Sequence, residues 1–192
     1  MYLTTARATP LIAVALIATV VTQVLYISTG VSGTAGALVL WRSEAVAFLA
    51  VALLGFVLVR DTPLVAGGLV LGGLFNVLQV GIGITMFGPL GEGGDPLAPV
   101  MGAVLDFAFF IYHAGKIGFA AAAVALGLAA WSGATGLAKI LGMLALLAGL
   151  AALATNLFAL AGGSATFLAG ACGTAATLFL ALAISAARPA EG

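Results

Sequence analysis

The sequence predicts an all-α membrane protein, a polytopic bundle of about six spanning helices joined by short loops. Hydrophobic residues make up 64% and charged residues 6% of the 192 residues, whereas soluble domains carry about 25% charged residues. The mean hydropathy is +1.30. Several apolar runs follow one another, each near the length of about 20 residues that crosses a bilayer. These observations predict a single integral membrane domain over residues 1–192.

Each predicted helix is placed by its apolar run and by the residues that interrupt the run. Pro10 is expected in the first turn of the first helix, where its missing N–H costs little. Arg60-Asp61-Thr62-Pro63 forms a tight turn before the third helix, and Gly88-Pro89 is expected to end that helix. The predicted ranges are about 10–27, 38–60, 63–87, 99–130, 136–161 and 164–187.

The fourth apolar run, from Val100 to Trp131, is longer than an upright spanning helix requires. At 1.5 Å per residue it would measure roughly 48 Å, whereas the hydrocarbon core of a bilayer is about 30 Å thick. Two alternatives follow. The run is either one strongly tilted helix or an interfacial segment followed by a spanning helix.

The distribution of basic residues predicts the orientation in the membrane. With six helices, the side of the two termini receives Arg7, Arg60, Lys139 and Arg188. The opposite side carries Arg42 and the acidic loop 91–96. Because basic loops stay on the cytoplasmic side, both termini are expected in the cytoplasm. The short loops and the richness in alanine, glycine, leucine and valine indicate a bacterial inner membrane.

Composition also argues against several classes of site. The formal net charge is +0, so no basic surface for nucleic acid is expected. The chain has one histidine and one cysteine, Cys172, which is too few for a disulfide, a histidine-rich zinc site or a haem held by two histidines. No metal and no cofactor are therefore predicted. The expected partners are the lipid bilayer and either other membrane subunits or a second copy of the chain.

Small residues recur at helical spacing on two of the predicted helices. Helices in lipid associate through close backbone approach and a few polar contacts, and small residues permit both. The predicted packing residues are Gly68 and Gly72 on the third helix and Gly142, Gly149 and Asn156 on the fifth.

Charged residues inside the apolar runs are the candidates for function. Each costs about 2.5 to 3.5 kcal/mol at the centre of a spanning helix, so its presence needs a reason. Asp106 and His113 are about 20° apart on the fourth helix, and Lys116 lies about 60° further round. Glu44 is expected at about the depth of Asp106, with Lys116 near the midplane. This placement predicts a cavity entered from outside past the two carboxylates.

The candidates for this ligand or proton pathway are Glu44, Asp106, His113, Lys116, Asn76 and Gln79. Structural alternatives exist for each of them. Lys116 can extend towards the headgroups, the carboxylates can be interfacial, and His113 can be a core histidine bonded to a carbonyl. The amides Asn76, Gln79 and Asn156, together with Gln23 on the first helix, are typical of hydrogen bonds between helices.

Gly30-Val31-Ser32-Gly33 resembles the Gly-x-Ser-Gly segment of rhomboid intramembrane proteases. The resemblance implies Ser32 as a nucleophile and His113 as its base. It covers fewer than ten residues. In rhomboids the serine follows several helices and a His-x-x-x-Asn helix, whereas Ser32 follows one helix and that motif is absent.

Three functions are compatible with this sequence. The first is a transporter or channel-like protein that handles a small polar solute or a proton on the polar face of the fourth helix. The second is a non-catalytic subunit or assembly factor of a larger membrane complex. The third is an intramembrane enzyme, which the lone histidine and lone cysteine disfavour. A transporter should turn its polar face into its own bundle, a subunit should turn it outward, and an enzyme should place a nucleophile beside His113.

Overall fold

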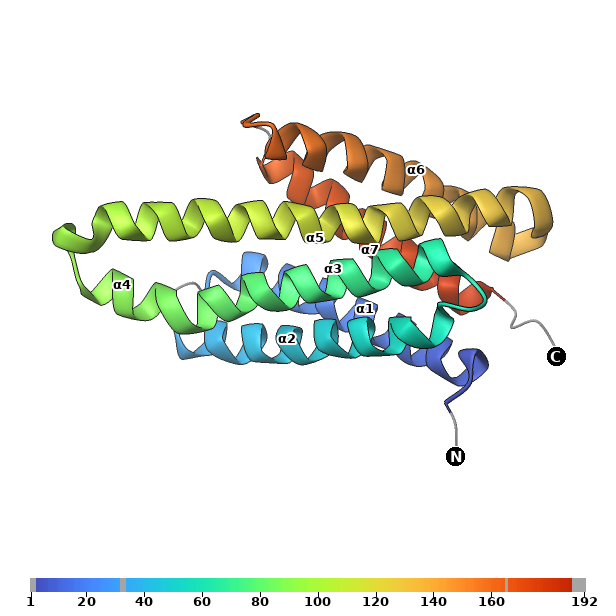
Figure 1. The fold of residues 1–192 in the computed structure, drawn as a ribbon, viewed down its shortest axis with the longest axis horizontal. Coiled ribbons are helices and arrows are strands. Elements are labelled where there is room, and N and C mark those ends of the chain that lie inside the picture. Colours follow the sequence, from blue (N-terminus) through green and yellow to red (C-terminus); the bar gives the residue numbers. More distant parts are fainter. Residues whose placement is uncertain (1–2, 32–33, 165, 188–192) are drawn as a thin grey trace.

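The computed structural model describes residues 3–31, 34–164 and 166–187. Over these ranges the chain is helical and contains no strand, which confirms the all-α fold class. Six of the helices are long and apolar enough to cross a membrane, as expected of a multi-pass membrane protein. Figure 1 shows them as a bundle of elongated, roughly aligned helices.

The helical elements, in chain order, are α1 Thr5–Thr29, α2 Ala35–Gly55, η1 Phe56–Leu58, α3 Pro63–Ile82, η2 Gly83–Phe87, α4 Gly88–Glu92, η3 Asp95–Leu97, α5 Ala98–Gly133, α6 Gly136–Leu160 and α7 Thr166–Ala186. The short elements η1 and η3 are 3₁₀ turns, and η2 is a π-helical turn. The turns η1 and η2 extend α2 and α3 without a break, so that one span covers Ala35–Leu58 and another covers Pro63–Glu92.

The first helix begins earlier than the sequence predicts. It starts at Thr5, so that Pro10 lies inside α1 and not in its first turn. Pro10 lacks the N–H that would bind the carbonyl of Ala6, and the helix therefore loses one backbone hydrogen bond near its end. The backbone N–H of Ala8 donates to the carbonyl of Thr4 at 2.9 Å, which holds the turn before the proline.

The third helix does not end at Gly88-Pro89. The π-helical turn η2 precedes these residues, and Pro89 occupies the first turn of the short helix α4. Because η2 runs directly into α4, Pro89 lacks the N–H that would bind a carbonyl of the preceding turn, and the π-helical turn lies where this hydrogen bond is missing. The structure thus accommodates the proline by a change of helical pitch, where the sequence indicates a break.

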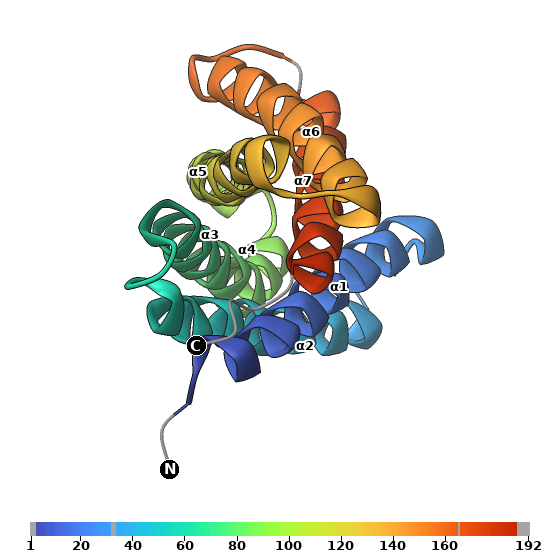
Figure 2. The ribbon, with the colours of Figure 1, turned by 90° about the vertical axis from the view of Figure 1, so that its right-hand side faces the viewer.

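The long apolar run forms one continuous helix. α5 has 36 residues, which at 1.5 Å per residue is about 54 Å. Figure 1 shows its first turns, together with α4, projecting beyond the ends of the neighbouring helices. Its central part packs against α3, α6 and α7, as the end-on view in Figure 2 shows.

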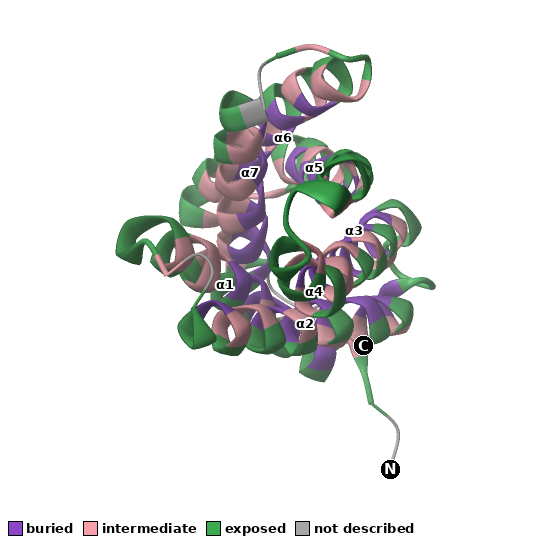
Figure 3. Ribbon diagram, turned by 90° about the vertical axis from the view of Figure 1, so that its left-hand side faces the viewer, coloured by how far each residue is buried: buried purple, intermediate pink, exposed green. Residues whose placement is uncertain are grey.

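The core lies between the inner faces of these helices, and large apolar side chains cover the outside. Phe48 of α2 and Phe119 of α5 have no exposed surface, and their rings stack with centroids 5.9 Å apart. Figure 3 shows buried residues along the inner faces of the helices and exposed residues on the outer faces. Many exposed side chains are leucine, valine and phenylalanine, which lipid solvates well.

Glycine permits close approach between α5 and two of its neighbours, α3 and α6. A Cβ added to Gly68 of α3 would lie 2.5 Å from the carbonyl oxygen of Gly118, and one added to Gly72 would overlap the ring of Phe119. On α6, a Cβ at Gly149 would lie 2.9 Å from the carbonyl oxygen of Ala120. Gly142, also on α6, lies against Ala130 of α5.

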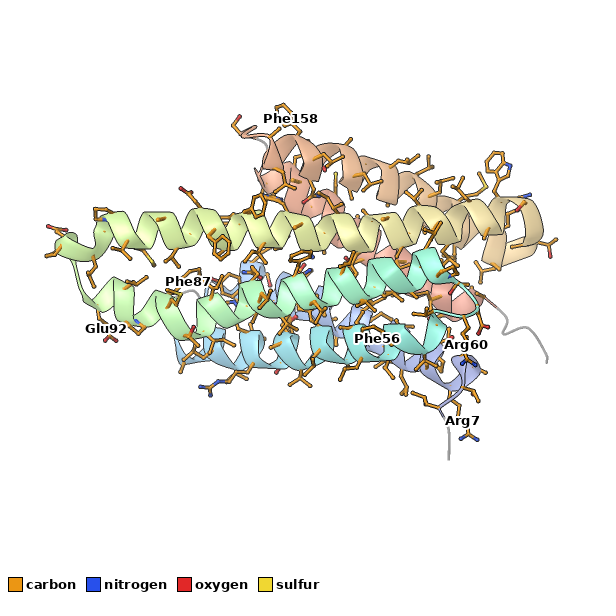
Figure 4. All side chains as sticks on the ribbon, viewed as in Figure 1. Arg7, Phe56, Arg60, Phe87, Glu92 and Phe158 are labelled. Carbon is orange, nitrogen blue, oxygen red and sulfur yellow. The ribbon has the colours of Figure 1, made fainter. Side chains whose placement is uncertain are left out.

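Two of the basic residues that predict the orientation lie at one end of the bundle. Figure 4 shows Arg7 and Arg60 at the end where α1 begins and α7 finishes, and Glu92 at the opposite end. Arg188, which contributes to the predicted orientation, lies outside the described residues. The cytoplasmic placement of the end that carries Arg7 and Arg60 stays a prediction of the positive-inside rule.

This orientation can be tested with single introduced cysteines. In a Cys172→Ser background, Glu92→Cys should react with a membrane-impermeant maleimide added to intact cells. Thr62→Cys, in the turn at the other end, should react only after the cells are opened. Labelling of Thr62→Cys in intact cells, with Glu92→Cys protected, would reverse the predicted orientation.

Candidate functional site

Lys116 lies in the middle of a polar cluster inside the bundle. It has no exposed surface, and Gly173 of α7 provides the space for its aliphatic stem, because a Cβ there would lie 2.9 Å from Lys116 Cδ. Its Nζ donates a hydrogen bond of 3.1 Å to Gln23 Oε1 of α1 and lies 5.1 Å from the centroid of the Tyr112 ring. The ammonium group is thus held by an amide oxygen and by the face of an aromatic ring.

Gln23 connects this ammonium group to a carboxylate. Its Oε1 also accepts a hydrogen bond of 2.9 Å from Thr174 Oγ1 of α7. Because Oε1 accepts from two donors, the amide NH₂ group remains available, and it donates to the side chain of Glu44 on α2. One glutamine therefore bridges two opposite charges that come from different helices.

Glu44 is buried and only partly hydrogen-bonded. Its side chain is 7% exposed, and within the described part of the chain its Oε1 has no hydrogen-bond partner. Buried carboxylate oxygens are almost always paired, because an unpaired one loses its hydration without compensation. Within the described residues, this oxygen of Glu44 therefore lacks the compensation that a hydrogen-bond donor would supply.

This cluster borders a cavity of about 660 Å³. The cavity is lined by residues of α1, α2, α3, η2, α5 and α7, at the end of the bundle that carries the Glu92 loop. Polar lining residues are Gln23, Glu44, Gln79, His113 and Thr174. The rise per residue of a helix gives the depth of three of them: Gln23, Glu44 and Thr174 lie roughly 9 to 14 Å from the helix ends on the side of the Glu92 loop. These polar groups are thus below the entrance of the cavity.

Aromatic rings form much of the remaining wall: Tyr26, Trp41, Phe87, Phe109, Tyr112 and Phe167. The Trp41 ring is in contact with two of the others, since its centroid is 5.5 Å from that of Tyr26 and 5.9 Å from that of Phe87. Trp41 precedes Glu44 by three residues, so both side chains lie on the same face of α2. A molecule in the cavity would meet the carboxylate and the rings together.

His113 also lines the cavity and is held from behind by Asn156 of α6. Asn156 Nδ2 donates to the carbonyl oxygens of Ala152 and Ala169 at 2.9 and 3.0 Å, so its Oδ1 can only accept. The contact of 2.8 Å between His113 Nδ1 and this oxygen therefore requires a proton on Nδ1. In the neutral ring, Nε2 is then an acceptor, and within the described residues it has no hydrogen-bond partner.

The structure brings some of the sequence-predicted residues together and separates others. Glu44, Gln79 and His113 line the cavity, and Lys116 lies behind its floor. Asn76 is buried against α5, where it packs on Gly115 and donates to the carbonyl of Gly72 at 2.7 Å.

Asp106 lies apart from this group. It is exposed and is not among the residues that line the cavity. The cavity therefore has one of the two predicted carboxylates in its lining, that of Glu44, which lies below the entrance. Asp106 shares a helical face with the cluster, but it is about 15 Å from Lys116 along the helix axis.

Sequence reasoning did not select Gln23, Tyr112 or Thr174 for the site. Gln23 was visible as an amide in an apolar run, but an amide there is equally typical of contacts between helices. Tyr112 and Thr174 are common residue types in spanning helices. Their role depends on the packing of α1 and α7 beside α5, which the sequence alone does not indicate.

The rhomboid resemblance depends on a serine that the structure does not describe. Ser32 and Gly33 lie outside the described residues, and the Nδ1 atom of His113 bonds to Asn156. No family model matches the chain, and neither a curated protein nor a solved structure matches it. The functional argument therefore rests on the cavity and its contacts.

Proposed function

We propose that the protein is a membrane transporter that binds a small solute in the cavity beside Glu44. The observation that carries the proposal is the pair of buried charges, Glu44 and Lys116, bridged by Gln23 at the inner end of this cavity. Ionisable groups inside spanning segments are costly and typically mark substrate or ion pathways. This polar group faces the interior of the bundle, which is the arrangement expected of a transporter.

Stability alone is a poor explanation for the charge pair. Replacing a buried ion pair by apolar residues of similar size is often neutral or stabilising. In addition, Glu44 Oε1 and His113 Nε2 remain without partners in the described structure although both residues line the cavity. A solute with hydrogen-bond donors would offer partners that a purely structural role of these residues does not supply.

The shape of the bundle is compatible with access from both ends. A second cavity of about 770 Å³ lies at the opposite end and is lined by residues of α5, α6 and α7. Between the two cavities these helices pack through the buried alanines Ala120, Ala152 and Ala176. The π-helical turn η2 contributes Phe87 to the first cavity, and such turns are frequent at functional sites. We infer that a shift at the alanine contacts exposes the site to each end in turn.

The two other functions have less support. The glycines of α3 and α6 lie against α5, inside the bundle, so these seams are not turned towards a partner protein. The hydrogen bond of His113 Nδ1 goes to an amide and not to a hydroxyl or thiol, which does not favour a nucleophile activated by this histidine.

Uptake into proteoliposomes tests the proposal. Radiolabelled choline, tyramine, glutamate and glucose provide cationic, anionic and neutral solutes, and at least one should accumulate only when the protein is present. Gly170→Leu should reduce this uptake at least tenfold, because Gly170 lines the cavity and an added Cβ meets only the Tyr112 hydroxyl, at 3.3 Å.

Gly67→Leu is the matched control, since Gly67 has open space around it and does not line the cavity. Uptake by this variant should equal that of the parent protein. The proposal would be wrong if no solute accumulated through the protein, or if Gly170→Leu transported as well as Gly67→Leu.

A further inference from the structure

From the lining of the cavity we infer the class of its ligand, on the basis of the proposed function: a small organic ammonium ion that carries N–H donors and an apolar body. The lining includes two residues with unpaired acceptor atoms, Glu44 and His113, and several aromatic rings, and it presents a carboxylate but no lysine or arginine.

The charge that a ligand meets is negative. Glu44 lines the cavity and has a free carboxylate oxygen, whereas Lys116 is fully buried and its Nζ is directed to Gln23 Oε1. The bridging glutamine and the Tyr112 ring thus hold the lysine ammonium behind the wall. The Glu44 carboxylate would repel an anion in the cavity, and it would attract a cation.

The two unpaired atoms, Glu44 Oε1 and His113 Nε2, need hydrogen-bond donors as partners. Glu44 Oε1 accepts hydrogen bonds, and in the neutral imidazole His113 Nε2 also accepts, because the contact with Asn156 requires the proton on Nδ1. A primary or secondary ammonium group has at least two N–H donors, which is the type of group that both acceptor atoms lack. A carboxylate ligand would leave both without a donor.

The walls suit the rest of such a molecule. Trp41 and its neighbours Tyr26 and Phe87 form a continuous aromatic surface on the Glu44 side. The faces of aromatic rings attract cations, and the ring surface also accommodates an apolar body. A volume of about 660 Å³ lies within the usual range of small-molecule sites, about 300 to 1,000 Å³.

Tryptophan fluorescence in detergent provides a direct binding assay. The chain has two tryptophans, so Trp131→Phe leaves Trp41 in the cavity as the only reporter. The probes are 2-phenylethylammonium, neutral 2-phenylethanol and anionic phenylacetate, which share a phenyl group and differ in charge. The ammonium ion should bind at least tenfold more tightly than the alcohol, and phenylacetate should bind most weakly.

Variants test whether the Glu44 carboxylate causes the preference for the ammonium ion. Glu44→Gln should reduce the preference for the ammonium ion over the alcohol at least tenfold. Because this change leaves Lys116 without a counter-charge, the double variant Glu44→Gln/Lys116→Met provides a second test, and it should bind the alcohol without preferring the cation. Asp106→Asn is the matched control: it removes an exposed carboxylate of α5 outside the cavity and should leave the preference unchanged.

The outcomes separate this inference from transport itself. Equal binding of the ammonium ion and the alcohol, tighter binding of phenylacetate, or a preference that survives in both Glu44 variants would overturn the ligand class. Uptake of glucose or glutamate that Gly170→Leu abolishes would then still support transport. Conversely, an ammonium preference lost with Glu44, in a protein that accumulates no solute, would support the binding site and refute the transporter.

Discussion

Gly68→Ala should lower the melting temperature of the protein in detergent, with a loss of about 2 kcal/mol or more in the free energy of unfolding. The added methyl carbon would lie 2.5 Å from the carbonyl oxygen of Gly118 and 2.8 Å from the backbone nitrogen of Ala122. Both are backbone atoms of α5, so no side-chain rotation can relieve the overlap. α3 and α5 must therefore move apart along a contact on which the bundle depends.

The neighbouring glycine supplies the control. Gly67→Ala adds the same methyl group to the same helix, one residue away, where no atom lies within 4 Å. Alanine has a higher helix propensity than glycine by about 1 kcal/mol, so this variant should melt at or above the temperature of the parent. Equal melting temperatures for the two variants would show that α3 does not approach α5 as closely as described.

The fold class could be predicted because the bilayer imposes a simple rule on composition. Every spanning segment must be long, apolar and helical, so residues such as Arg60 and Pro63 that interrupt the apolar runs mark the turns. The local conformation at Gly88-Pro89 could not be predicted in this way. The π-helical turn before it depends on packing, and residue preferences describe only the regular helix.

Parts of the candidate site were visible in the sequence for an energetic reason. Glu44 and Lys116 are costly in lipid, and that cost indicates an interior position and a partner. The partner itself was not predictable, because Gln23 is 93 residues from Lys116 in the chain. Only the packing of α1 against α7, and of α7 against α5, brings these side chains together.

Helical periodicity explains the different position of Asp106. The angular spacing places Asp106 and His113 on one face of α5 but does not indicate where the neighbouring helices end. α5 projects beyond the other helices at this end of the bundle. The face that is buried around His113 is therefore exposed at Asp106. Periodicity predicts the direction of a side chain, and the lengths of the surrounding helices determine its environment.

The buried charges should be strongly coupled in a double-mutant cycle. Lys116→Met leaves the Glu44 carboxylate without a cation, and Glu44→Gln leaves the Lys116 ammonium without an anion, so each single change should destabilise the protein by about 3 kcal/mol. The double variant removes both charges and keeps much of the shape. It should melt close to the parent, because neutral residues of similar volume are often as stable as buried opposite charges.

Thermal unfolding of the four proteins in the same detergent measures the coupling free energy. Asp106→Asn serves as the control for loss of a carboxylate, and because Asp106 is exposed, its effect should stay within about 0.5 kcal/mol. If the two single changes are each neutral and their effects simply add, Glu44 and Lys116 do not stabilise each other through Gln23. If the double variant retains the parent's stability but loses solute uptake, the charges serve transport and not folding, as the unpaired oxygen of Glu44 indicates.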